Sequence, residues 1–102
     1  MVYAYIQDVP IDEDLYWKVI EEIGSEPLAG SLVHLCVRRE DGGLRYIEVW
    51  ESKELCGKAF DERVHPAVDR AFGGERPQGE PTQNRLEVID ARGALIPEGI
   101  AP

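Results

Sequence analysis

The sequence has few positive charges and no segment typical of nucleic-acid or membrane binding. Eleven Lys and Arg residues stand against twenty Asp and Glu residues, which gives a formal net charge of −9. Such a field repels phosphate, so we expect neither nucleic acid nor an anionic membrane as a partner. The chain also lacks a signal-peptide pattern and an apolar run long enough to span a membrane. These features predict a cytoplasmic protein.

Cysteine is scarce, and the motifs of several chemistries are missing. Cys36 and Cys56 are the only two cysteines, and they are far apart without metal-like spacing, so we expect two free thiols. No His, Cys, Asp or Glu set has the spacing of a metal site, and no glycine-rich phosphate loop or nucleophilic-serine motif occurs. We therefore expect no metal and no cofactor.

The 102 residues fit one domain with a modest core. We expect residues 1–91 to form the core and residues 92–102 an extended tail. Burial of surface in an oligomer would increase the stability of a domain of this size.

The stretch from Gly30 to Phe60 is the centre of the predicted fold. It reads as a strand, a tight turn, a second strand and a helix with Ser52 as its N-cap. A three-residue loop, Asp41-Gly42-Gly43, with Gly43 left-handed, would pair Glu40 with Leu44. The pairs that follow from this loop are Val37 with Ile47, Leu35 with Val49, and His34 with Trp50.

This pairing separates the side chains of the hairpin into two faces, because neighbouring residues of a strand point to opposite sides. One face is aliphatic, with Val33, Leu35, Val37, Ile47 and Val49. The other is polar and aromatic, with His34, Cys36, Tyr46, Glu48 and Trp50.

Flanking segments supply the other elements. Residues 2–9 form a predicted strand, and a helix runs from the N-cap Asp12 to Gly24 with Trp17 pointing outward. We expect the second helix to break after His65 because of Pro66, a short helical piece to follow, and a last strand over residues 85–91.

The predicted order of strand, helix, strand, strand, helix, strand is typical of an α+β, ferredoxin-like βαββαβ sandwich. Both helices would cover one face of an antiparallel sheet. The other face of the hairpin is too apolar to remain in water, and a second copy of the sheet is its simplest cover. We therefore predict a homodimer.

The chain resembles the dimeric α+β barrel superfamily, and within it the antibiotic-biosynthesis monooxygenase-like branch. The similarity covers roughly residues 1–91 and rests on Gly30-x-x-x-His34, Gly42-Gly43, Glu48-Val-Trp50-Glu51-Ser52 and the following helix with Phe60. The resemblance implies that Trp50 lines a cavity between the sheet and the helices. It does not imply haem degradation, because Phe60 stands where those enzymes have an axial histidine, and Gln7 is the nearest amide to their strand-one asparagine.

The resemblance makes His34 a candidate base for an acidic phenol or enol, with Glu48 orienting its ring. Alternatively, these two buried polar groups simply satisfy each other. Arg63 could face Glu48 or an anionic ligand, or could lie near a helix C-terminus for structural reasons. The expected substrate-binding residues are Trp50, Tyr46, Phe60, Arg63 and Tyr16.

Two functions fit these residues. One is a cofactor-independent monooxygenase that acts on a small aromatic or polyketide-like compound. The other is a non-catalytic dimer that binds a small hydrophobic ligand or serves as an accessory subunit. An open cavity bordered by His34 and Trp50 would favour ligand chemistry, whereas a fully packed one would favour a structural role.

Overall fold

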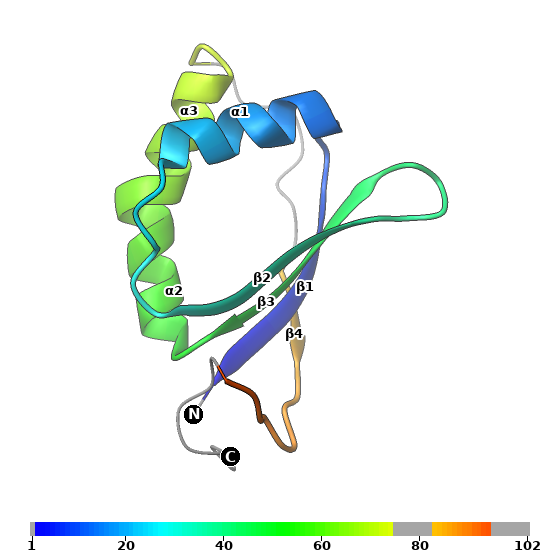
Figure 1. Ribbon diagram of the computed structural model, residues 1–102, viewed down its shortest axis with the longest axis vertical. Helices are drawn as coiled ribbons and strands as arrows, with labels where there is room; N and C mark the ends of the chain where they lie inside the picture. Colours follow the sequence, from blue (N-terminus) through cyan, green and yellow to red (C-terminus); the bar gives the residue numbers. More distant parts are fainter. Residues whose placement is uncertain (1, 75–82, 95–102) are drawn as a thin grey trace.

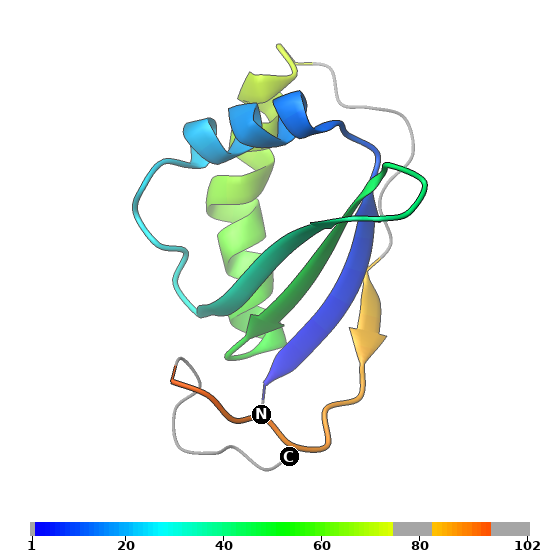
Figure 2. The same ribbon diagram turned by 45° about the vertical axis from the view of Figure 1, so that its right-hand side comes forward.

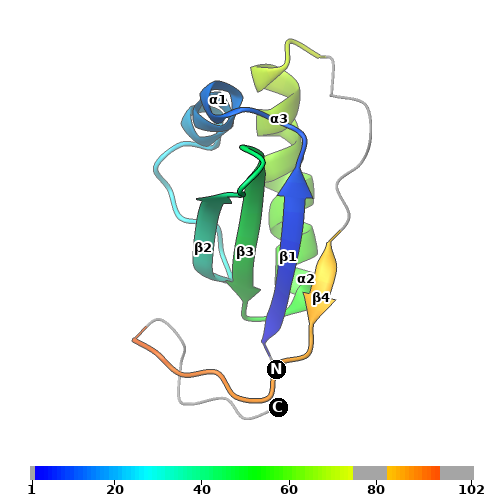
Figure 3. The same cartoon turned by 90° about the vertical axis from the view of Figure 1, so that its right-hand side faces the viewer.

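The computed structural model has one helical layer packed on one face of a four-stranded antiparallel sheet (Figure 1). It describes residues 2–74 and 83–94. The strands are β1 (Tyr3–Val9), β2 (Ser31–Arg38), β3 (Leu44–Trp50) and β4 (Asn84–Leu86). They lie in the order β2-β3-β1-β4, which can be followed in Figure 3. This architecture confirms the predicted ferredoxin-like βαββαβ arrangement.

The first helix, α1 (Glu13–Ile23), begins and ends where the sequence predicts. The Asp12 carboxylate accepts the backbone N–H of Leu15 at 2.8 Å, and Gly24 ends the helix with a φ of 87°. Tyr16 and Val19 face the core, whereas Trp17 is exposed. The amphipathic pattern therefore placed this helix correctly.

The second helical segment passes Pro66 without the predicted break. It consists of α2 (Lys53–Ala59), the π-helical turn η1 (Phe60–Val64) and α3 (His65–Ala71), and Ser52 caps its start. Val64 and His65 keep right-handed helical dihedrals. A π-helical turn changes which carbonyl each N–H meets, so the missing N–H of Pro66 is accommodated where α3 starts. Figure 2 shows the three pieces as one continuous column behind the sheet.

The β2–β3 hairpin has the predicted kind of loop one residue earlier than expected. Arg39 pairs with Gly43, the left-handed residue is Gly42 with a φ of 91°, and the Asp41 carboxylate accepts the Gly43 N–H at 2.9 Å. The predicted register is therefore wrong by two residues. His34 lies opposite Glu48 rather than Trp50, Leu35 opposite Ile47, and Val37 opposite Arg45.

A shift of two residues keeps every side chain on its predicted face. The polar and aromatic set of β2 and β3 faces the helices, and the aliphatic set faces away from them. A β-bulge between Ser31 and Val33 interrupts this pairing at the start of β2. There Gly30 has a φ of 89°, and a Cβ on it would lie 2.7 Å from the Cβ of Leu55, so only glycine fits against α2.

The last strand is shorter than predicted. It pairs with β1 over Asn84–Leu86 only, with Ala4 opposite Leu86, and residues 87–91 do not continue it. Most of the predicted tail, over residues 95–102, lies outside the described residues.

The core between sheet and helices consists of two apolar clusters. One contains Tyr3, Tyr5, Trp50, Cys56 and Ala59, and the other contains Val9, Tyr16 and Leu44. The buried carboxylate of Glu48 lies among these elements, and it is the centre of the site described next.

Candidate functional site

Glu48 is the buried centre of a hydrogen-bonded network on β3. Its side chain is only 6% exposed, and its two oxygens have three hydrogen-bond partners, namely a phenol, an indole and an imidazole. Oε1 accepts from the Tyr5 hydroxyl and from the Trp50 indole N–H, both at 2.8 Å, and Oε2 lies 2.7 Å from Nδ1 of His34. Three converging donors fit an ionised carboxylate, which can only accept hydrogen bonds.

The bond to Glu48 fixes the ring of His34. Because a carboxylate is a pure acceptor, Nδ1 of His34 carries the hydrogen, and Nε2 is the free base of the neutral ring. The Tyr16 hydroxyl lies 2.8 Å from Nε2, and in this tautomer the hydroxyl is the donor. Tyr16, His34 and Glu48 thus form a continuous chain from α1 through β2 to β3.

The same network keeps its phenols protonated. Burial, followed by the nearby Cys36 and Glu48, raises the pKa of Tyr16 to about 12. Burial and the adjacent Glu48 carboxylate also raise the pKa of Tyr5 well above its ordinary value. Both tyrosines are therefore hydrogen-bond donors at neutral pH, and neither is a base.

His34 lies where the network meets solvent. Its side chain is 35% exposed, and it borders a groove of about 350 Å³ between α1 and the edge strand β2. The groove is lined by Glu13, Tyr16, Trp17, His34, Leu35, Cys36, Val37, Arg38 and Leu44. A volume of this size lies within the range of small-molecule sites.

Aromatic rings surround the imidazole. The ring of Tyr46 is 5.1 Å from His34 and 5.8 Å from Tyr16, in edge-to-face contact with each. Tyr16 lies parallel to His34 with centroids 6.1 Å apart. Burial raises the pKa of Tyr46, so this wall is uncharged.

The structure brings together four of the predicted site residues, namely Tyr16, His34, Tyr46 and Glu48. Trp50 belongs to the network through its N–H, but it is 1% exposed and lies in the core beside Phe60, at a ring distance of 6.1 Å. The groove is therefore bordered by His34 but not by Trp50, which meets the predicted criterion for a ligand cavity only in part.

Arg63 lies elsewhere and has structural partners. Its guanidinium donates to the carbonyl oxygens of Ile23 and Pro27, each at 2.9 Å. These are the last residue of α1 and a residue of the loop that follows. The structure thus places Arg63 at the end of α1, not at Glu48.

Tyr5 is the residue that the sequence analysis missed. It lies directly opposite Glu48 in the β1–β3 pair and is fully buried. The signal was its position on the same face of β1 as Tyr3, but only the pairing of β1 with β3 shows which polar group its hydroxyl meets.

A second depression, of about 490 Å³, lies at the tip of the hairpin and is lined by Val37, Arg38, Arg39, Glu40, Asp41 and Arg45. Its charged groups form ion pairs with one another and with neighbours, such as Arg39 with Asp41 and Arg45 with Asp8. None of the described hydrogen-bond partners of Glu48 lines it, so the smaller groove, which His34 borders, is the better candidate site.

Among the described residues, no group of three His, Cys, Asp or Glu side chains is arranged to hold a metal ion. Both cysteines are free thiols. Within the same part of the chain, no helix is long and apolar enough to cross a membrane.

The fold and site together define a ferredoxin-like α+β domain with a polar network under its helices. A Chloroflexus aurantiacus J-10-fl protein described as a candidate antibiotic biosynthesis monooxygenase has this fold, with a TM-score of 0.58 and 17% identity over 91% of this chain and 98% of its own. An antibiotic biosynthesis monooxygenase structure matches with the same TM-score and 19% identity over 87% of this chain and 99% of its own.

No protein-family model matches the sequence, and no curated protein matches it significantly. At identities this low, the structural matches define the fold and not the reaction. The predicted resemblance to antibiotic-biosynthesis monooxygenase-like proteins is thus confirmed at the level of fold.

Proposed function

We propose that this chain binds a small hydroxylated aromatic or polyketide-like compound in the groove beside His34 and oxidises it as a monooxygenase. The observation that carries the proposal is the chain of Tyr16, His34 and Glu48. A partly exposed imidazole, held through Nδ1 by a buried carboxylate, has its basic Nε2 at a groove of ligand size. Two solved structures that share the fold of this chain are described as antibiotic biosynthesis monooxygenases, which supports the proposed reaction type.

In the proposed reaction, an enolisable substrate replaces the Tyr16 hydroxyl at Nε2 of His34. Nε2 takes the proton, and Glu48 stabilises the imidazolium that forms, as an orienting carboxylate does in a catalytic triad. The substrate carbanion then adds to dioxygen, which is the oxidant. The peroxide anion that forms takes the proton back from Nε2, which regenerates the neutral imidazole. The hydroperoxide then loses water, so that a CH2 group and O2 give a carbonyl group and H2O.

Anthrone, whose central CH2 enolises, is a suitable probe of this chemistry. Dioxygen uptake in its presence should exceed the uncatalysed rate, and His34→Ala should return the rate to that background. His65→Ala is the matched control, because His65 is the other histidine and its ring contacts Phe60 instead of the network. Wild-type protein that shows no uptake above background with anthrone would count against oxygenase activity.

Glu48→Gln tests the role of the carboxylate separately. The amide keeps the shape of the side chain but cannot stabilise an imidazolium by charge. We expect turnover to fall by about 100-fold or more, with a smaller change in KM. A variant with unchanged turnover would remove Glu48 from the mechanism.

A non-catalytic ligand-binding role is the second candidate, and two observations favour it. Both ring nitrogens of His34 already have protein partners, and Trp50 is packed in the core. In that case anthrone would raise the melting temperature without being consumed, because binding to the native state stabilises it.

We also propose that the protein is a homodimer joined through the sheet face that the helices leave uncovered. That face carries the aliphatic residues of the hairpin, and Leu35 on it is 49% exposed. Leu35 and Val37 also line the groove, so a second copy on this face would border the ligand site.

A further inference from the structure

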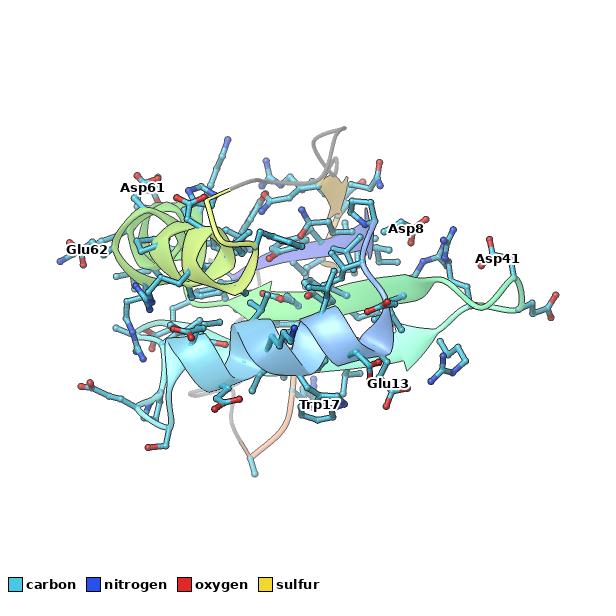
Figure 4. The ribbon with its side chains drawn as sticks, turned by 90° about the horizontal axis from the view of Figure 1, so that it is seen from above. Asp8, Glu13, Trp17, Asp41, Asp61 and Glu62 are labelled. Carbon is cyan, nitrogen blue, oxygen red and sulfur yellow. The ribbon has the colours of Figure 1, made fainter. Side chains whose placement is uncertain are left out.

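Glu13 links α1 to the edge strand β2 at the rim of the groove. Its carboxylate accepts the indole N–H of Trp17 at 3.3 Å and forms an ion pair with the guanidinium of Arg38. Figure 4 shows Glu13 and Trp17 next to one another along α1. One carboxylate therefore holds both the aromatic platform and the cation of the rim.

This arrangement pairs the cation of the groove with a carboxylate, which a ligand anion would have to compete with. Arg38 is the only Lys or Arg among its described lining residues, and Glu13 occupies it. Glu48 adds a second carboxylate directly behind His34. The remaining lining is aromatic or apolar apart from His34 and the Cys36 thiol.

The protonation states of Glu13 and Tyr16 indicate which ligand charge the groove favours. The Trp17 hydrogen bond, followed by the Arg38 guanidinium, lowers the pKa of Glu13, so the rim carboxylate is ionised at neutral pH. Tyr16 is itself a phenol bonded to Nε2, and burial, with Glu48 nearby, keeps it in its neutral form. A ligand phenol in the same place meets the same environment.

We infer that the groove accepts uncharged hydroxylated aromatic compounds, and that Glu13 is the residue that excludes their carboxylated analogues by holding Arg38. This inference rests on the ligand site of the proposed function and adds the charge class of the ligand. A neutral ring can lie on Trp17 with its hydroxyl at Nε2 of His34. A carboxylate at the rim would meet Glu13 instead of a free guanidinium.

Glu13→Gln tests the inference with little change of shape. The amide keeps its length and can still accept from Trp17, but the charge that neutralises Arg38 is lost. The Arg38 guanidinium would then attract an anionic ligand without a competing carboxylate, so affinity for such a ligand should rise by about tenfold.

The probes are naphthol and the hydroxynaphthoate that differs from it by one carboxylate, and binding is measured by calorimetry at neutral pH. Glu62→Gln is the matched control, because it removes one negative charge from the net −9 of the chain. Figure 4 shows Glu62 on η1, at the opposite side of the molecule from Glu13. His34→Ala reports whether a probe binds in the groove at all.

We expect wild-type protein to prefer naphthol, and Glu13→Gln to gain hydroxynaphthoate affinity by about tenfold with naphthol binding unchanged. Glu62→Gln should change neither. If naphthol binding depends on His34 but both probes bind wild type equally, or Glu13→Gln gains nothing, the inference about Glu13 is wrong and the site stands. If neither probe binds, or binding ignores His34→Ala, the ligand site and the inference both fail.

Discussion

The two faces of the sheet differ in a way that reverses the usual sorting by polarity. The face under the helices buries a carboxylate with its tyrosine, tryptophan and histidine partners. The face away from the helices carries the aliphatic residues of the hairpin, and there Leu35 is half exposed. The more polar set is thus the better buried of the two.

Hydrogen bonds explain the first half of this contrast. A buried carboxylate is tolerated where donors surround it, and three donors surround Glu48. The exposed aliphatic face calls for a different explanation. Such a face is stabilised when another apolar surface covers it, because apolar groups are then removed from water. The helical face is therefore complete within one chain, whereas the aliphatic face would be covered by the second copy in the proposed dimer.

Breaking the buried network should have the largest effect. Glu48→Ala leaves the hydroxyl of Tyr5, the N–H of Trp50 and Nδ1 of His34 without their acceptor, so we expect about 3–5 kcal/mol of destabilisation in urea unfolding. Glu48→Gln, which keeps an acceptor oxygen, should cost less than half as much. Equal losses for the two variants would show that the hydrogen bonds do not stabilise the fold.

Breaking the aliphatic face should change assembly more than folding. Leu35→Glu places a charge at the proposed contact between copies, and we expect the dimer to dissociate in sedimentation at micromolar concentration, at a cost of about 2–4 kcal/mol of association energy. Ser25→Glu, at an exposed loop position, adds the same charge and should leave the dimer intact. A wild-type protein that sediments as a stable monomer would contradict the proposed interface.

High pH should weaken the helical face specifically. Burial, followed by Glu48, raises the pKa of Cys56 from 9.0 to about 11, and that of Tyr16 rises from 10.0 to about 12. The unfolded chain releases these protons first, so their contribution is present below pH 9 and is lost as the pH rises through 12. We expect a fall of roughly 1–2 kcal/mol for each group.

Thermal unfolding from pH 8 to pH 12 measures this fall. Cys56→Ala should flatten the curve between pH 9 and pH 11, and Tyr16→Phe between pH 10 and pH 12. Parallel curves for wild type and both variants would exclude these two groups as the cause.

Arg63 should have the smallest effect and none on the site. Arg63→Leu removes two hydrogen bonds to the carbonyls of Ile23 and Pro27, which should destabilise the protein by about 1 kcal/mol. Naphthol affinity should not change. A loss of affinity with unchanged stability would restore Arg63 to the substrate-binding set.

The sequence predicted correctly which face of the sheet each hairpin side chain occupies, but it did not predict which residues of β2 and β3 lie opposite one another. Alternation places His34 and Glu48 on one side under any even register shift, so the error at the hairpin loop changed the partner of His34 from Trp50 to Glu48 and left both on the predicted face. The loop itself depended on whether Gly42 or Gly43 is left-handed. In the observed loop Gly42 is left-handed and the Gly43 N–H donates to Asp41, an arrangement that residue types alone do not distinguish from the alternative.

Features that depend on distant contacts were not predictable from local patterns. The Tyr5 hydroxyl donates to Glu48 because β1 pairs with β3. The Arg63 guanidinium donates to the carbonyl of Ile23, at the end of α1, from another helix of the layer. The π-helical turn before Pro66 likewise depends on helix packing, which overrides the local tendency of proline to end a helix.

The tautomer of His34 tests the central claim most directly. Nitrogen-detected NMR of the imidazole rings at pH 8 distinguishes a protonated Nδ1 from a protonated Nε2, and His65→Asn assigns the signals because the chain has two histidines. We predict that Nδ1 of His34 carries the hydrogen toward Glu48 and that Nε2 is unprotonated at the groove. A hydrogen on Nε2 instead would leave the groove without its base and contradict the proposed site.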